Sequence, residues 1–580
     1  MIRFAAFIVL LTLSLGSSFK AWAAPIQNAD GFWSEWSDAT FARATREHKF
    51  VIVSLQSWWC KWCHVMNEET WSKAEVRSVL NDKFIPVYVD QDSRPDISQR
   101  YERWGWPATI IFGPDGKEIV KLRGFYSPQF FVPVLADTIK DPTPVDYGDA
   151  SPERERSLAT GLTVSQRASI LTFINDAWDT KDGGWSRSKF VDGPMLTWAL
   201  QRARQGDKEN EVRIRKVLTL MADTMVDKET GGVSQVNLKS DWSEPAREFP
   251  MFTQEAALSA YSRAAVMFGD PTYRLAADRI FGFLKNTMAG PDGGFYASMG
   301  LSEGAPGVDN RQYARETAQA ISALTSYYDA TGVAEARDLA VAGGNWAIDN
   351  RSISGGGFRH AKEDVGGPYL ADNVEMAKAL IALHRSTGDR KWLTRAAAAA
   401  DFIDRTFIDQ RTGGFIASAS PDAKQIVKPI KQREDNVTAV RMFGLLSAYT
   451  GEHRYREIAE AGMGYLTSPA ILDAYGFLPD VLLAEDELRN EPVHVTIVGA
   501  KDDPRSAALY KAALAYPLGN KRAEWWDKRE GKLASSDVDY PDYPAGPAAF
   551  ACTSSFCSYP VTEPQDIAAQ LDGLKRQRKL

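Results

Sequence analysis

Paired glycines followed by an apolar residue recur through the middle of the chain, and this repeat constrains the fold more than any other feature. Successive turns lie 48 to 63 residues apart. They stand at Gly183-Gly184-Trp185, Gly231-Gly232-Val233, Gly293-Gly294-Phe295, Gly356-Gly357-Phe358 and Gly413-Gly414-Phe415, with Gly476-Phe477 as a degenerate sixth. A second series of single glycines alternates with the first, at Gly206, Gly269, Gly332, Gly388 and Gly451. A period of about 40–60 residues with two helices per unit predicts an array of helical hairpins that bury their faces against their neighbours.

Apolar residues at three-to-four spacing support helices between these glycines. The helical segments are 311–328, 372–384, 391–407 and 434–449. Six units favour closure into an (α/α)6 barrel over residues 163–490, with an open solenoid as the alternative.

A polar pair stands at the start of each predicted inner helix, about sixteen residues before the single glycine. These pairs are Thr253-Gln254, Glu316-Thr317, Asp372-Asn373 and Asp435-Asn436. One interpretation is structural, because Asp, Asn and Thr cap helix N-termini. The other is a ring of carboxylates and amides at one mouth of the barrel, as acid–base chemistry on a sugar requires. The candidate cavity residues are Glu316, Asp372, Asn373, Asp435 and Asn436.

The N-terminus has the features of a secretory signal. Arg3 precedes an apolar run over residues 4–15, and Ala21-Trp22-Ala23 supplies small residues for cleavage after Ala23. The run is shorter than the ~20 residues needed to span a bilayer, so no stable span remains after cleavage, although an uncleaved tether is the alternative. The expected location is periplasmic or secreted, which is an oxidising environment.

Residues 24–147 form an α/β unit with a dithiol. The strand Phe50–Leu55 leads into Cys60-Lys61-Trp62-Cys63, a helix follows, and Phe84–Val89 is the next strand. A Cys-x-x-Cys between strand and helix is the arrangement of a redox pair, because the helix N-terminus stabilises the first thiolate. Cys60 is expected to attack and Cys63 to resolve, facing solvent. Trp62 and His64 flank the pair; His64 either tunes the thiol or is a packed, hydrogen-bonded ring.

A proline at the start of a later strand adds specificity. Pro107 begins the segment Pro107–Phe112, which turns through Gly113-Pro114-Asp115-Gly116. This pattern resembles the thioredoxin fold, in which such a proline takes a cis bond opposite the dithiol. The resemblance implies that Pro107 shapes a groove for a partner's strand, and an ordinary edge-strand proline is the alternative.

Two longer motifs carry a closer resemblance. Cys60–Met66, together with Val89–Ile97 and Tyr101, is similar to the spermatogenesis-associated thioredoxin-like family and its bacterial relatives. The resemblance implies a thioredoxin-like module followed by a barrel like those of N-acylglucosamine 2-epimerase and six-hairpin glycosidases, in an exported bacterial member. It does not imply one reaction. Three histidines in the barrel region, His360, His384 and His453, offer no obvious pair for two-base epimerisation.

Residues 148–162 are the predicted linker, and residues 491–580 a small α/β appendage. The appendage has a strand over 492–500 and a helix over 504–515. Cys552 and Cys557 most simply form a local disulfide. A relay from this pair to Cys60 and Cys63, or four thiolates around zinc, are alternatives.

The net charge of the chain argues against nucleic acid as a binding partner. Lys plus Arg number 68 against 75 for Asp plus Glu, so no basic excess exists to bind nucleic acid. The sequence indicates no cofactor and no metal. The leading hypothesis is an exported thiol–disulfide oxidoreductase acting on protein thiols and disulfides, with the barrel as a binding domain. The alternative is a carbohydrate-binding or carbohydrate-modifying barrel with a structural thioredoxin-like module, and a third hypothesis is an inert scaffold.

Overall fold

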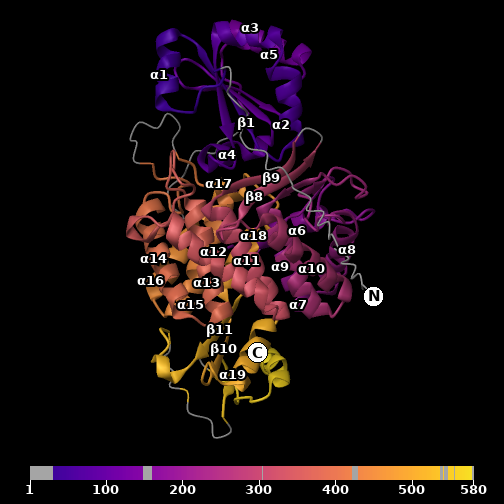
Figure 1. The fold of residues 1–580 in the computed structure, drawn as a ribbon, viewed down its shortest axis with the longest axis vertical. Coiled ribbons are helices and arrows are strands. Elements are labelled where there is room, and N and C mark those ends of the chain that lie inside the picture. The colour runs from indigo at the N-terminus through magenta and orange to yellow at the C-terminus, as the bar shows by residue number, and fades with distance from the viewer. Residues whose placement is uncertain are drawn as a thin grey trace, which may run out of the picture.

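The chain folds into three parts arranged along the long axis of the molecule (Figure 1). The computed structural model describes residues 31–147, 160–302, 305–420, 429–535, 540, 546–553 and 556–577. The predicted signal peptide, residues 1–23, and most of the predicted linker lie outside the described residues. No helix in the described part of the chain is both long and apolar enough to cross a membrane.

The N-terminal module is a four-stranded sheet in the order β2-β1-β3-β4, in which only β1 and β2 are parallel. Every residue of β1 is buried because helices cover both faces. One face packs on α3 and α5, the other on α1 and α4. The elements are α1 (Asp38–Glu47), β1 (Phe50–Gln56), α2 (Lys61–Met66), α3 (Ala74–Lys83), β2 (Phe84–Asp90), α4 (Pro95–Tyr101), β3 (Ala108–Phe112), β4 (Glu118–Arg123) and α5 (Pro128–Lys140).

The middle of the chain is a closed (α/α)6 barrel, so the open solenoid is wrong. Six inner helices pack side by side in a ring that closes between α18 and α7. They are α7 (Gly193–Arg204), α9 (Met251–Phe268), α11 (Ala314–Thr331), α13 (Leu370–Thr387), α15 (Arg433–Thr450) and α18 (Pro479–Arg489). The outer helices are α6 (Val164–Asp176), α8 (Lys208–Thr224), α10 (Pro271–Phe283), α12 (Ala334–Arg351), α14 (Arg390–Phe407) and α16 (His453–Leu466).

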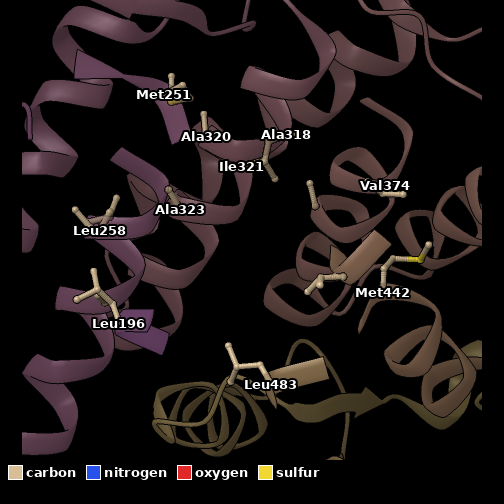
Figure 2. Packing of buried hydrophobic residues seen from close by; sticks show 14 of the residues in the cluster. Leu196, Met251, Leu258, Ala318, Ala320, Ile321, Ala323, Val374, Met442 and Leu483 are labelled. Atoms are coloured by element: carbon tan, nitrogen blue, oxygen red, sulfur yellow. The ribbon is translucent and has the colours of Figure 1, made fainter. Parts of the chain in front are cut away.

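The single glycines of the sequence repeat end the inner helices. Gly332, for example, follows α11 with φ +69°, and its N–H donates to the carbonyl of Tyr328 at 2.7 Å. Glycine adopts this left-handed conformation at little cost, and it ends α9, α11, α13 and α15 in the same way. One apolar cluster contains buried residues of both inner and outer helices, and Figure 2 shows some of its members on the inner helices, including Leu196, Leu258 and Ile321.

Each end of the barrel carries a small sheet. At the N-terminal ends of the inner helices lie β7 (Glu248–Pro250), β8 (Tyr296–Ser302) and β9 (Ala305–Gln312). At the other end sits the appendage, a sheet in the order β11-β10-β12 with two helices and the Cys552–Cys557 disulfide. Its elements are β10 (Val493–Val498), α19 (Pro504–Ala515), β11 (Lys521–Trp526), β12 (Ala548–Cys552) and α20 (Ile567–Gln577).

Candidate functional site

The dithiol has the local geometry of a thioredoxin-like site. Cys60 is the N-cap of α2, its Sγ accepts a hydrogen bond from the N–H of Cys63 at 3.2 Å, and the two cysteines form a disulfide. The Trp106–Pro107 bond is cis, and Trp106 packs with the cysteines. The helix N-terminus therefore faces Cys60, the position that favours its thiolate.

The dithiol does not face solvent, in contrast to the expectation from the sequence. Cys60 is 3% exposed and Cys63 1% exposed. The barrel covers them: the N–H of Lys61 donates to Oε1 of Glu248 in β7 at 3.0 Å. The ring of Trp58 lies against β9 at Gly307, where an added Cβ would be 3.6 Å from it. These contacts join residues some 190 to 250 positions apart, which no local motif predicts.

The residues that flank the dithiol have different surroundings. His64 is half-buried, and its Nε2 lies 2.7 Å from the carbonyl oxygen of Trp58. This bond holds the loop before Cys60, as the packed-ring interpretation of His64 requires. Trp62 is 49% exposed and contacts Phe125.

The second residue of each polar pair bonds the backbone of the apolar residue that follows the preceding glycine pair, which is Val233 for Gln254 and a phenylalanine for the other three pairs. Asn373 accepts from the N–H of Phe358 at 2.8 Å and donates to the carbonyl oxygens of Phe358 and Tyr369 at 3.1 and 2.7 Å. Asn436 makes the same bonds to Phe415 and Gln432. The amide donors of Asn373 and Asn436 are thus taken up by backbone carbonyl oxygens, and the assignment of these two residues to the cavity stays a prediction.

The first residue of each pair lies at the barrel mouth. Asp372 bonds Nδ1 of His360 at 2.9 Å and the N–H of Arg315 at 2.9 Å. Asp435 accepts from Nε2 of Gln99, in α4 of the N-terminal module, at 2.7 Å. Oε2 of Glu316 is buried without a hydrogen-bond partner in the described residues. The mouth therefore holds three buried acidic residues in three different surroundings.

The segment that follows β2 docks the N-terminal module onto this mouth. Asp90 accepts from Arg311 in β9 at 2.9 Å, and the hydroxyls of Ser93 and Tyr313 lie 2.9 Å apart. Nε2 of His360 lies 2.6 Å from the carbonyl oxygen of Asp92. The Val89–Ile97 motif, which the sequence singled out only as a family resemblance, is thus an interdomain contact.

Burial at this interface raises the pKa of several carboxyl groups. It raises the pKa of Asp435 to about 7, against the opposing charge of Arg315, and the pKa of Asp92 to about 8, helped by Asp90. The pKa of Glu316 is also raised by burial. Burial alone would lower the pKa of His360, but the carboxylate of Asp372 outweighs it and raises the value to about 9.

Docking is expected to weaken as the pH rises from about 6.5 to 9. Asp372 and Glu316, which raise the pKa of His360 most, belong to the barrel and remain beside it when the module undocks. Docking adds the carbonyl oxygen of Asp92, which accepts from protonated His360, so docking takes up part of a proton as the pH rises toward about 9. Asp92 acts in the same direction. Amide exchange in α4, corrected for intrinsic rates, should accelerate across this range, and less so in His360→Gln. A wild-type profile without pH dependence would contradict this.

Charged side chains continue from the mouth into the lumen, the space enclosed by the six inner helices. Lys378 of α13 pairs with Glu255 of α9 at 2.9 Å and also with Glu375. Because α11 separates α9 from α13 in the ring, the Lys378–Glu255 pair must cross the lumen. The side chain of Lys378 is 34% exposed, so water reaches this point. The helical spacing of Glu255, Glu375 and Lys378 was not distinctive enough to identify them from the sequence.

Comparisons with known families divide the chain in the same way. Residues 23–132 match a thioredoxin-like family of the DsbH type, described as a protein of unknown function, DUF255. Residues 202–467 match the beta-L-arabinofuranosidase GH127 catalytic domain. Spermatogenesis-associated protein 20 from Mus musculus is 23% identical over 306 residues, which are 46% of this chain and 38% of the mouse protein. The match therefore spans well under half of that relative's length.

Sugar isomerases and epimerases are among the solved structures that are similar to this chain. A D-mannose isomerase is 14% identical, with a TM-score of 0.47, and the match covers 56% of this chain and 96% of the isomerase. A sugar epimerase from a ruminal bacterium is 15% identical, with a TM-score of 0.45, over 52% of this chain and 86% of the epimerase.

Proposed function

Since this chain is a relative of spermatogenesis-associated protein 20 that joins a DsbH-type thioredoxin-like module to a GH127-like helical domain, we propose that its barrel binds a carbohydrate in the lumen and cleaves a glycosidic bond there. The thioredoxin-like module closes one end of the site. Furanosides are the first substrate class to test, because the matching GH127 family is described by that activity.

One observation carries the proposal: acidic and basic side chains from non-adjacent inner helices meet inside the lumen. Glycoside cleavage needs a carboxylic acid that protonates the leaving oxygen and a carboxylate that activates water or attacks the sugar. With its pKa raised to about 7, Asp435 is protonated in about half of the molecules at neutral pH and suits the first role. Glu375, which lies close enough to raise the pKa of Asp435, supplies the second carboxylate.

The other groups position the sugar. Arg315 and Lys378 are cationic donors to hydroxyl oxygens, and Glu255 is an acceptor held on Lys378. Asp372 and His360 bond each other and fix the mouth, so His360 has no free nitrogen with which to abstract a proton from carbon. This arrangement favours hydrolysis over two-base epimerisation.

Sugar binding by paired lysine variants tests the proposal. The wild type is screened by calorimetry and with chromogenic aryl furanosides and pyranosides. Lys378→Met, inside the lumen, should weaken the binding of any sugar found at least tenfold, because a charge-assisted donor is lost. Lys391→Met, an exposed lysine on outer helix α14, should leave binding unchanged. No binding across the panel, or equal losses in both variants, would overturn the proposal.

Dithiol exchange is the second candidate function, favoured by the position of Cys60 at the tip of α2 opposite Pro107. The thiolate of Cys60 would attack a substrate disulfide, one substrate sulfur would leave as a thiolate, and Cys63 would then displace the other and restore the Cys60–Cys63 disulfide. The β7–β9 cover must open first. Cys63→Ser incubated with insulin should accumulate a mixed disulfide, and Cys60→Ser should not. If neither Cys63→Ser nor Cys60→Ser formed a mixed disulfide with insulin, the result would count against thiol–disulfide exchange.

A further inference from the structure

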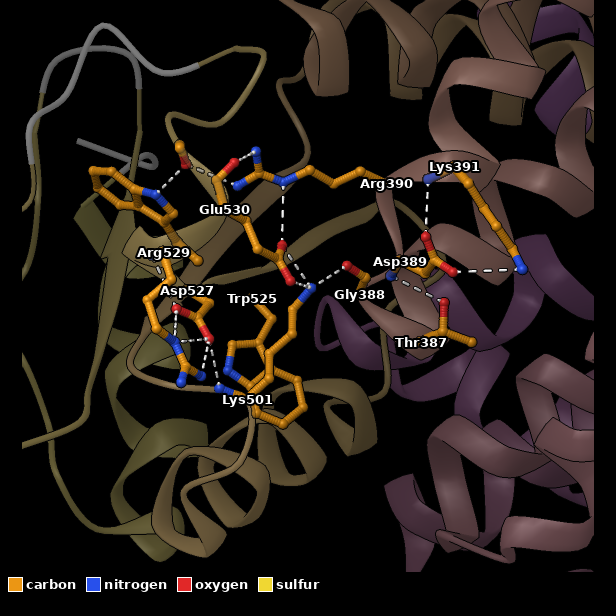
Figure 3. Close-up of polar contacts among 12 residues, drawn as sticks. Thr387, Gly388, Asp389, Arg390, Lys391, Lys501, Trp525, Asp527, Arg529 and Glu530 are labelled. Atoms are coloured by element: carbon orange, nitrogen blue, oxygen red, sulfur yellow. Dashed lines mark hydrogen bonds and ion pairs between the residues drawn. The ribbon is translucent and has the colours of Figure 1, made fainter.

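A small cavity lies between the barrel and the appendage, at the end of the barrel away from the dithiol. Its volume is about 60 Å³, and it is lined by the C-terminal parts of α9, α11 and α13 and by residues 514–521 of the appendage. Figure 3 shows a neighbouring part of the same interface, where Lys501 donates to the carbonyl of Gly388 at 2.8 Å. We call the site the basic cavity, after its polar lining residues Ser262, Arg263, Asp329, Arg385 and Lys521.

Cations outnumber carboxylates in the basic cavity. Asp329 is its only acidic residue, and it is already bonded to Arg385 at 2.9 Å and to Ser386 at 2.7 Å. Lys521 donates to the carbonyl of Tyr516 at 2.8 Å and to that of Leu514, so it caps the C-terminus of α19. One carboxylate thus faces three cationic side chains.

Arg263 has no anionic partner. In the described residues no hydrogen bond or ion pair joins its guanidinium to another group, and the nearby Glu487 is held by Arg441 at 2.7 Å. An unpaired cation in a partly buried position is unfavourable unless a counter-ion is present. The protein itself supplies none here.

A buried hydroxyl points to the same ligand. Ser262 is fully buried and lines the basic cavity, yet its Oγ has no hydrogen-bond partner among the described residues. We propose that the basic cavity binds a small oxyanion, phosphate or sulfate, through Arg263, Lys521 and Ser262. A guanidinium presents a planar pair of donors that matches two oxygens of such an ion, and the serine hydroxyl and lysine ammonium add donors to the others.

Size and access agree with this assignment. A single water occupies on the order of 10–15 Å³ on this scale, so about 60 Å³ holds an ion of a few heavy atoms. Arg263 and Gly519 also line a neighbouring cavity of about 1010 Å³. That larger space carries the carboxylates of Asp486 and Glu487, so the anion belongs in the smaller one.

The test measures anion binding by the full chain. At fixed ionic strength, replacing chloride by phosphate or sulfate should raise the melting temperature of the wild type, and calorimetry should give a dissociation constant at least tenfold weaker for Arg263→Gln. Arg202→Gln is the control, because Arg202 lines the larger cavity but not the basic cavity, and its side chain is paired with Asp207. Binding near pH 7.5 should also take up protons: burial lowers the pKa of Lys521 to about 7, with Arg385 and Arg263 opposing Asp329, and a bound anion raises it.

Misfolding of the variant cannot imitate the expected result. Without oxyanion, Arg263→Gln should melt no lower than the wild type, because it lacks an unpaired buried cation. The wild type should gain stability only when phosphate or sulfate is added. Stabilisation no greater than that by chloride, or equal affinity in Arg263→Gln and the wild type, would overturn the proposal.

Discussion

Asp435→Asn is expected to lower kcat for glycoside cleavage by about 10²–10⁴-fold, the range that general acid catalysis contributes. The amide keeps the shape of the side chain and can still accept from Gln99, which donates to Asp435 at 2.7 Å. It cannot release a proton to the leaving oxygen. The barrel should therefore fold and bind sugar normally while the chemical step is lost.

The pH dependence of the wild type gives an independent check. An acid must be protonated to act, so kcat should fall as the pH rises through about 7, the raised pKa of Asp435. Asp404→Asn is the matched control, because Asp404 also has its pKa raised by burial but lies on outer helix α14. Asp404→Asn should keep the wild-type rate. If Asp435→Asn kept it as well, Asp435 would not be the proton donor.

Asn373→Ala is expected to lower the free energy of unfolding of the barrel by about 3–5 kcal/mol. The side chain is fully buried and satisfies three backbone groups, the N–H and C=O of Phe358 and the C=O of Tyr369. Each buried polar group left without a partner costs about 1–3 kcal/mol. Alanine supplies none of these bonds, and no other polar side chain in the described structure bonds these groups.

Urea unfolding followed through the barrel transition measures this loss. Asn490→Ala is the control, since its exposed amide makes a single bond to the carbonyl of Asp486, and it should cost less than about 0.5 kcal/mol. Similar small losses in both variants would show that the aromatic turn does not depend on its clamp. Asn436→Ala should behave like Asn373→Ala, because it clamps Phe415 in the same way.

The two glycine series predicted the barrel because they report directly on backbone geometry. A single glycine such as Gly388 stops an inner helix in the left-handed conformation, and the paired glycines place an aromatic residue against the next repeat. The same repeat places the polar pairs at the starts of the inner helices. The sequence does not show, however, that the two residues of a pair have different roles. Asn373 and Asp372 are neighbours with different roles because one faces the aromatic turn and the other the mouth.

The parts that the sequence missed depend on contacts between distant segments. The cover over Cys60 comes from Glu248, and the docking of Asp92 depends on His360. The Lys378–Glu255 pair crosses a lumen that exists only after the ring has closed. Composition and local periodicity contain no information on contacts between such distant residues. The position of the dithiol at the N-terminus of α2, in contrast, follows from the local sequence of strand, Cys-x-x-Cys and helix.

The central claim is that the barrel lumen is the carbohydrate site, and a structure of Asp435→Asn with a bound sugar tests it most directly. The sugar is expected inside the ring of inner helices, with its hydroxyls bonded to Lys378 and its glycosidic oxygen facing residue 435. A sugar bound only outside that ring, for example against the appendage, would contradict it.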